Sequence, residues 1–178
     1  MDALRDRIPD YARDLRLNLS SVLTTQGAPG LSEPQLWMTA LASAIASRNA
    51  ELARAVEAAA TEKLEPVQVE AARAAAAIMG MNNVYYRFLH LVEDDEYAKL
   101  PARLRMNVIG SPGIDKADFE LMSLAVSAVN GCGKCVASHE RILRQHELGR
   151  EAVQSAVRIA SVIHAVAGVL DYETARAA

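Results

Sequence analysis

The sequence predicts an all-α fold. Alanine and leucine dominate the 178-residue chain, whereas aromatic residues account for only 4% of it. Alanine and leucine are strong helix formers, and no stretch alternates apolar and polar residues for long enough to indicate a half-buried strand. Residues that cap or break helices divide the chain into its predicted elements.

The first of these helices is predicted to start after Ser32. Ser32 and Gln35 have the spacing of a capping box, in which each side chain accepts a hydrogen bond from the other residue's backbone N–H. Pro34 suits the first helical turn. This helix should end near Asn49, which can cap a second helix over 50–64.

The next helix is predicted to start at Pro66 and to be interrupted near its middle. Gly80 and the pair Asn82 and Asn83 are poor residues for a helix interior, and a renewed helical pattern, "VYYRFLHLV", follows them. The segment 101–114 contains prolines and glycines and has weak helical signals. It is the best candidate for a linker.

Three further helices are predicted after this linker. Asp115 can cap the stretch "KADFELMSLAVSAV". The next helix covers 131–148, and the last covers 150–173, after Gly149.

An internal repeat is predicted from a shift of the sequence by 84 residues. The shift places "WMTALASAI", 37–45, over "LMSLAVSAV", 121–129, without a gap. Two similar three-helix halves about a pseudo-twofold axis would explain this match, and a chance alignment of alanine-rich helices is the alternative. We expect one domain, 1–178, with a scaffold half of about 1–100 and a catalytic half of about 101–178.

Charge and hydropathy limit the functions to be considered. The net charge is −3 and basic residues are scattered among acidic ones, so no nucleic-acid partner is expected. The N-terminal "MDALRDRIPDYARD" lacks the apolar run of a signal peptide, and no uncharged apolar segment reaches the ~18 residues of a membrane helix without a glycine or proline. We expect a cytoplasmic chain with no membrane contact, in which cysteines are kept reduced.

Both cysteines lie in "NGCGKCVASHE", 130–140. Asn and Gly end helices, so a helix should begin near Cys132 and carry Cys135 in its first turn. A helix N-terminus stabilises a thiolate by only ~0.3 to 1 kcal/mol. His139 can add to this, because it lies four residues after Cys135 on the same helical face, and Lys134 adds a positive charge nearby.

Glu120 is the other candidate residue for this site. A lone carboxylate in "FELMSLAVSAV" is costly to bury without a partner. Paired with His139, it would orient the imidazole and transfer its proton. The alternative is a glutamate near a helix start that faces water.

Three interpretations of the cysteines stay open at this level. A redox dithiol fits CxxC at a helix start with a histidine one turn on. Zinc fits the three potential ligands Cys132, Cys135 and His139, and inert core thiols fit the common burial of cysteine. The methionines and aromatics of "MGMNNVYYRF" have the spacing of a packing stripe rather than of a cofactor site.

A family resemblance adds to this picture. "AAAAIMGMNNVYYRF", "LRMNVIGSPGIDKADFELMSLAVSAVNGC" and CxxCxxxHE together resemble the alkyl hydroperoxide reductase D (AhpD) family of the carboxymuconolactone-decarboxylase-like superfamily, over nearly the whole chain. The resemblance implies an all-α fold with an internal duplication and a homotrimer. It also implies a disulfide reductase and weak hydroperoxidase of antioxidant defence.

The resemblance further implies partners and residue roles. Electrons would come from dihydrolipoamide on the lipoylated acyltransferase subunit of a dehydrogenase complex and pass to the peroxiredoxin AhpC, with no tightly bound cofactor and no metal. Cys135 would be the nucleophile, Cys132 the resolving thiol, and Glu120 with His139 the proton relay. Lys134 stands where well-known members have a histidine, and lysine is a poor proton shuttle near neutral pH.

Two observations favour different cysteines as the one that attacks. Proximity to the helix N-terminus favours Cys132, whereas the spacing to His139 and the resemblance favour Cys135, which we predict. Two alternative functions stand beside the redox enzyme. One is a carboxymuconolactone-decarboxylase-like enzyme, and the other is a zinc-binding trimeric scaffold without redox activity.

Overall fold

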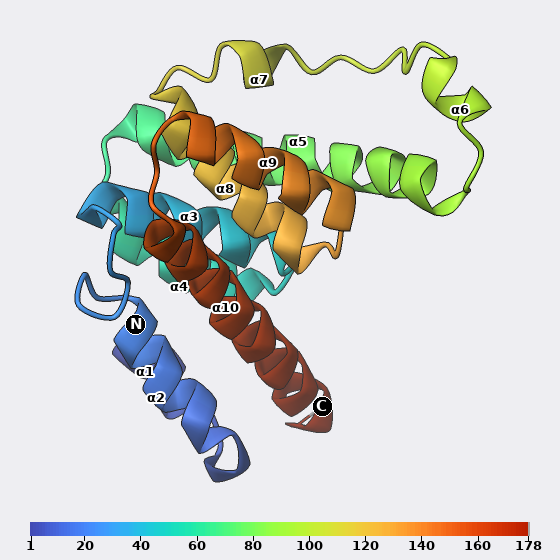
Figure 1. The fold of residues 1–178 in the computed structure, drawn as a ribbon. Helices are drawn as coiled ribbons and strands as arrows, with labels where there is room; N and C mark the ends of the chain where they lie inside the picture. The colour runs from blue at the N-terminus through green and yellow to red at the C-terminus, as the bar shows by residue number, and fades with distance from the viewer. Residues whose placement is uncertain (178) are drawn as a thin grey trace.

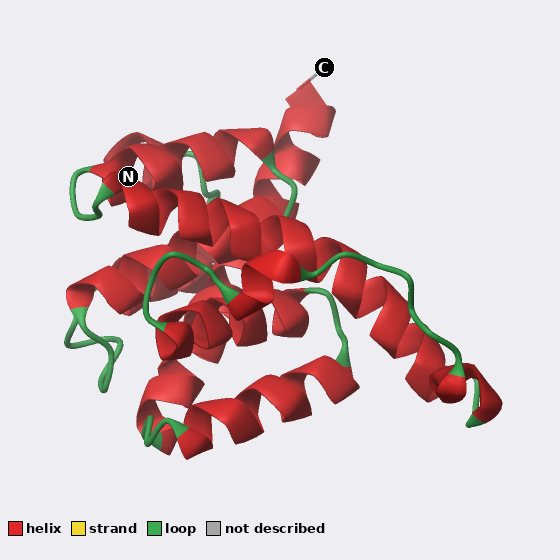
Figure 2. Ribbon diagram, turned by 90° about the horizontal axis from the view of Figure 1, so that it is seen from above, coloured by secondary structure: helices red, strands yellow, loops and turns green. Residues whose placement is uncertain are grey.

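The computed structural model describes residues 1–177 and confirms the all-α prediction, with no β-strand among those residues. Figure 1 shows the arrangement of the helices, and Figure 2 shows the same chain turned by 90°. The elements are α1 (Asp2–Asp6), the 3-10 helix η1 (Asp10–Ala12), α2 (Arg13–Val22), α3 (Glu33–Ala46), α4 (Ala50–Thr61), α5 (Pro66–Leu91), α6 (Glu96–Lys99), α7 (Asn107–Gly110), α8 (Lys116–Val129), α9 (Gly133–Gln145) and α10 (Arg150–Ala177).

Helices α3 and α8 form the centre of the core. Every residue from Leu36 to Ala44 in α3, and every residue from Phe119 to Ser127 in α8, is buried. A helix that is buried on all sides needs neighbours all round. The two helices pack against each other, and each packs against both α5 and α10, while α4 covers α3, α9 covers α8 and α2 lies on α10.

The predicted caps are present. Ser32 and Gln35 form a complete capping box, and the Asn49 side chain accepts a hydrogen bond of 2.7 Å from the backbone N–H three residues on. Asp115 accepts one of 2.8 Å from the N–H two residues on. These caps satisfy N–H groups that would otherwise lack partners, and Asp115 fixes where α8 begins.

The predicted interruption of the helix at Gly80 is wrong, because α5 is continuous through this region. Asn82 and Asn83 are buried, at 4% and 1% exposure, and Asn83 is hydrogen-bonded to Ser127 and Asn130. Low intrinsic propensity costs a helix up to about 1 kcal/mol per residue. Burial against α8 and these hydrogen bonds outweigh that cost.

The predicted linker lies within the long connection between α5 and α8. Residues 101–106 and 111–115 are irregular, and neither α6 nor α7 contains a buried residue. In Figure 1 this connection leaves the far end of α5 and returns above α5 and α9 to the start of α8. It therefore contributes little to the core but lies over two of the core's helices.

The helix order agrees with the 84-residue offset. Helices α3, α4 and α5 begin within one residue of the positions that this offset assigns to α8, α9 and α10. The two triplets thus match in order and register along the chain. A pseudo-twofold relation between them, and the division into a scaffold half and a catalytic half, stay predictions.

Helix α10 is the one helix of the described residues that is long and apolar enough to cross a membrane. Its buried residues include Ile159, Ile163, Val166 and Leu170, and it packs against α2, α3 and α8. Contact with the core accounts for its apolar composition.

Candidate active site

A tight turn between α8 and α9 positions both cysteines. Gly131 has a φ of +68°, a left-handed conformation that glycine adopts without steric cost. Its N–H donates to the carbonyl of Ala128 at 3.1 Å, and the N–H of Cys132 donates to the carbonyl of Ser127 at 3.0 Å. This pattern of backbone bonds closes α8 and places Cys132 at the N-cap of α9, near the predicted helix start.

Cys132 and Cys135 are joined by a disulfide bond in the structure. Cys132 has no exposed surface, whereas Cys135 is 6% exposed and lines a cavity. The backbone N–H of Cys135 donates to the sulfur of Cys132 at 3.3 Å. Only the Cys135 sulfur is therefore open to a molecule that enters this cavity.

The turn is held in place by a polar network from α5. The Asn83 amide donates to the hydroxyl of Ser127 at 2.8 Å and accepts from the Asn130 amide at 2.9 Å. Arg87 donates to the carbonyl of Asn130 at 2.6 Å. Because Asn130 lies two residues before Cys132, α5 restrains the approach of the chain to the first cysteine.

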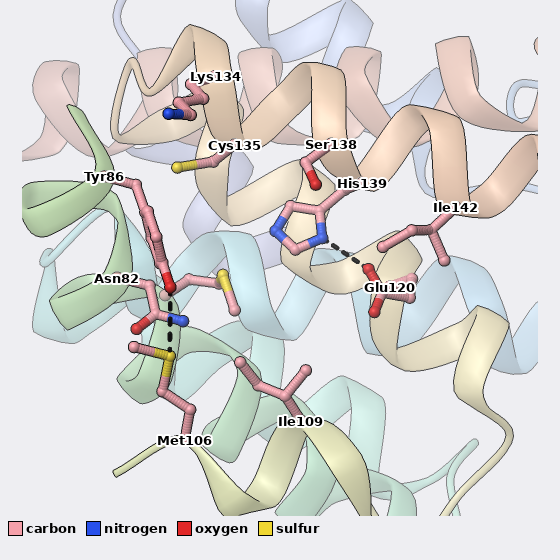
Figure 3. A pocket seen from close by; sticks show the side chains of 11 residues that line it. Asn82, Tyr86, Met106, Ile109, Glu120, Lys134, Cys135, Ser138, His139 and Ile142 are labelled. Atoms are coloured by element: carbon pink, nitrogen blue, oxygen red, sulfur yellow. Dashed lines mark hydrogen bonds and ion pairs between the residues drawn. The ribbon is translucent and has the colours of Figure 1, made fainter. Parts of the chain in front are cut away.

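Glu120 and His139 form a buried pair beside the cysteines. The Nδ1 of His139 lies 2.6 Å from an Oε of Glu120, whose side chain is 3% exposed (Figure 3). The predicted partnership is thus present, and the alternative of a glutamate that faces water is wrong. The other ring nitrogen of His139 is turned into the cavity, on the side of Cys135. This geometry fixes the ring orientation and leaves one nitrogen for proton transfer.

The cavity that contains these groups has a volume of about 340 Å³. It lies between α5, α8, α9 and the connection that precedes α8, as Figure 3 shows. Apolar side chains supply much of its wall, as is usual for sites that bind small organic molecules. Its lining residues are Met79, Asn82, Tyr86, Met106, Ile109, Glu120, Lys134, Cys135, Ser138, His139 and Ile142.

Lys134, which lies between the two cysteines in the sequence, lines this cavity. Its side chain is solvent-exposed and forms no ion pair among the described residues. It therefore adds a positive charge near Cys135 with no acidic partner to offset it.

Several lining residues were missed by the sequence analysis. Asn82 and Tyr86 line the cavity, whereas Met79 of "MGMNNVYYRF" belongs to the core, so the predicted packing stripe describes only part of this stretch. Polar residues four apart in a helix interior were the available signal, because they share one face. Met106 and Ile109 lie in the predicted linker, where no periodic pattern pointed to them.

The residues around the cysteines also bear on metal binding. Within residues 1–177 no group of three or more His, Cys, Asp or Glu side chains is placed to hold a metal ion. In this state the disulfide joins the two sulfurs that a zinc site would use. The absence of a metal from the function stays a prediction.

Comparison with known proteins relates the part of the chain that carries the CxxC site to a broad family of proteins. The sequence profile of the carboxymuconolactone decarboxylase family matches residues 95–175, which include α8, α9 and most of α10.

Relatives that cover nearly the whole chain narrow this class. The chain is 58% identical to the alkyl hydroperoxide reductase AhpD of Gluconacetobacter diazotrophicus over 96% of its length and 92% of the relative's. It is 57% identical to that of Rhodospirillum centenum, over 98% and 92%, and 53% identical to that of Streptomyces coelicolor, over 100% and 98%. The chain belongs to the AhpD family, as its sequence motifs predicted.

Proposed function

We propose that this protein is an antioxidant alkyl hydroperoxide reductase and disulfide reductase that works through the Cys132–Cys135 dithiol. The relatives that share its full length are named alkyl hydroperoxide reductases. One observation carries the proposal: the Cys135 sulfur lies on the same cavity as the buried Glu120–His139 pair. A thiol nucleophile, a proton-transfer group and the group that orients it are thus collected at one place.

The oxidative half-reaction begins at Cys135, which lines the cavity while Cys132 is fully buried. The Cys135 thiolate attacks the terminal oxygen of a hydroperoxide ROOH and breaks the O–O bond, which leaves a sulfenic acid on Cys135. The departing alkoxide takes a proton from His139 and leaves as ROH. Cys132 then attacks the Cys135 sulfur, which forms the disulfide and releases water.

The reductive half-reaction returns two electrons and two protons. A dihydrolipoyl thiolate attacks the Cys135 sulfur, breaks the disulfide and frees Cys132, which is protonated. The second lipoyl thiol then attacks the lipoyl sulfur of the mixed disulfide, closes the lipoyl ring and releases Cys135. The reduced dithiol can pass its electrons to a disulfide of AhpC by the same exchange.

Glu120 and His139 carry the proton transfers in this scheme. The hydrogen bond from Nδ1 of His139 to the Glu120 carboxylate fixes the ring, so that the ring nitrogen in the cavity gives and takes the proton. Lys134 stabilises the Cys135 thiolate by its charge and takes no part in the proton transfers.

We also propose a homotrimer that acts in the cytoplasm. Val84, Phe88 and Leu91 are exposed along one face of α5, at 59%, 46% and 68%, and Leu100 is 62% exposed in the connection beyond it. An exposed apolar surface of this kind is typical of a subunit contact. Light scattering of the purified protein would measure its mass in solution.

The dithiol cycle is tested by the intact mass of the protein. Reduced, metal-free protein is treated with oxidised lipoamide and then with dihydrolipoamide, with Cys132→Ser and Cys135→Ser as controls. We expect a loss of two hydrogens that reverses on reduction and is absent from both variants. An unchanged mass in the unsubstituted protein would refute the redox function.

A further inference from the structure

Two polar side chains on the α5 wall of the cavity lack strong partners within the protein. Asn82 is 4% exposed, its Oδ1 is fully buried, and no hydrogen bond to its side-chain amide occurs among the described residues. The hydroxyl of Tyr86 has only the sulfur of Met106 as a partner, at 3.8 Å, and a thioether is a weak acceptor. Both groups line the cavity that holds Cys135.

The unpartnered amide of Asn82 contrasts with that of the next residue. Asn83 is equally buried, and its amide is hydrogen-bonded to both Ser127 and Asn130. Buried amides without partners are uncommon in folded proteins, because the lost hydration is not replaced. The fold thus satisfies the amide of Asn83, which faces α8, whereas the amide nitrogen of Asn82 stays without a partner on the cavity side.

The two groups are arranged to act together. Asn82 and Tyr86 lie four residues apart on α5, so they share one face of the helix. Figure 3 shows both side chains reaching toward Met106, on the opposite wall of the cavity from Cys135 and His139 of α9. A molecule that reacts with Cys135 can therefore contact both of them along its length, with the apolar residues Met79 and Ile109 beside it.

The ligand must offer both a donor and an acceptor. The Asn82 oxygen has no accessible surface, so the amide nitrogen is the polar group of Asn82 that a ligand can reach, and it donates. The Tyr86 hydroxyl can donate or accept. A carboxamide is complementary, since its carbonyl accepts from Asn82 and its N–H donates to Tyr86. An ionised carboxylate has no N–H for the Tyr86 hydroxyl, and its charge would lose hydration between apolar walls.

We propose that Asn82 and Tyr86 form a subsite for the carboxamide of a lipoyl-lysine group, so that the cavity distinguishes a lipoyl amide from dithiols without an amide. This inference rests on the proposed dihydrolipoyl donor. A lipoyl group combines a dithiol, an apolar chain and an amide, and the cavity presents a disulfide sulfur, apolar walls and two amide-binding groups in turn. Asn82 and Tyr86 position the donor and exchange no atoms with it, so the thiol–disulfide exchange at Cys135 is unchanged.

The subsite is tested with three reductants and the substitution Asn82→Leu. Rates of reduction of the Cys132–Cys135 disulfide are measured by quenched alkylation and intact mass with dihydrolipoamide, dihydrolipoate and dithiothreitol. In the unsubstituted protein we expect dihydrolipoamide to react about tenfold faster than dihydrolipoate. Asn82→Leu should abolish this preference. It should lower the rate of reduction by dihydrolipoamide about tenfold and change the rate of reduction by dithiothreitol by less than about twofold.

Controls separate recognition from folding. Leucine has nearly the shape of asparagine and removes a buried group without a partner, so Asn82→Leu should melt at the same temperature as the unsubstituted protein or higher. Tyr86→Phe should lower the preference for the amide in the same direction. Asn18→Leu, at an exposed position of α2, should leave all three rates unchanged.

The outcomes also separate this inference from the proposed function. Equal slowing of all three reductants by Asn82→Leu, or no change with any of them, would overturn the subsite while the dithiol cycle stands. If dithiothreitol reduces the disulfide of the unsubstituted protein and dihydrolipoamide does not, both the lipoyl donor and the subsite are overturned.

Discussion

His139 Nδ1 and Glu120 Oε2 lie 2.6 Å apart and join α9 to α8 at a position almost closed to solvent. The carboxylate lies within the continuously buried stretch of the central helix α8, where an ionised group without a partner would be costly. The imidazole is the one hydrogen-bond partner of the Glu120 side chain among the described residues. The pair thus places a polar proton-transfer unit inside an apolar core.

Glu120→Gln should lower kcat/KM for hydroperoxide reduction by about 10²- to 10⁴-fold, the usual contribution of general acid–base catalysis. The amide keeps the shape of the side chain but removes the charge that orients and stabilises a protonated His139. The measurement is steady-state peroxide consumption with dithiothreitol as the reductant. Glu62→Gln, at an exposed residue beyond α4, is the matched control. Activity of Glu120→Gln within about threefold of the control would contradict the assigned role.

Cys135→Ser should abolish turnover, whereas Cys132→Ser should accumulate a mixed disulfide with a partner disulfide whose two halves separate on exchange. The buried Cys132 is the thiol that would resolve such an adduct on the accessible Cys135, so its removal leaves the adduct in place. Non-reducing mass spectrometry after incubation with glutathione disulfide, whose released thiol cannot close a ring, detects the added mass. An adduct found only in Cys135→Ser would reverse the two roles.

Gly80→Ala should raise the free energy of unfolding by about 0.5 to 1 kcal/mol. Gly80 lies inside the continuous α5, a Cβ there meets no heavy atom within 4 Å, and alanine loses less backbone entropy in a helix. Urea unfolding followed by circular dichroism measures the change. Gly27→Ala is the contrasting variant, because its Cβ would overlap the carbonyl oxygen of Ser21 and should destabilise the fold. A Gly80→Ala protein less stable than the parent would show a role for Gly80 beyond the helix.

Asp118→Asn should change the pH dependence of stability in acid. Burial raises the pKa of the half-buried Asp118 carboxyl above its ordinary value and Asp115 adds to this, while the hydrogen bond from Gln35 opposes it. Because the pKa is raised in the folded state, protonation of Asp118 stabilises the fold relative to the unfolded chain. This stabilisation is fully present below the unfolded pKa of about 3.9 and is lost as pH rises through the folded pKa. The free energy of unfolding of the parent should therefore fall relative to Asp118→Asn between about pH 3 and 6.

The size of this difference should stay below about 1 kcal/mol, since water screens a half-exposed carboxyl. Denaturant unfolding of both proteins at a series of pH values measures it. A difference that is constant with pH, or that changes in the opposite direction, would contradict the raised pKa.

The features that could be predicted from sequence are those decided by neighbouring residues. The caps at Ser32, Asn49 and Asp115 depend on contacts within three residues, and the face shared by Cys135 and His139 follows from helical spacing.

The features that could not be predicted depend on contacts between distant segments. The continuity of α5 through Asn83 depends on a hydrogen bond to Ser127, 44 residues away. The places of Tyr86 and Met106 on the cavity likewise depend on how α5, α9 and the connection pack, for which no local pattern exists.

The connection between α5 and α8 has a consequence for how this protein can change over evolutionary time. It supplies Met106 and Ile109 to the cavity wall, yet α6 and α7 bury no residue in the core. Substitutions there can reshape the cavity wall at little cost in stability, whereas the cysteines and their proton-transfer pair lie on helices that pack closely against each other. Selection can therefore change which molecules the cavity binds while the reaction at the cysteines stays the same.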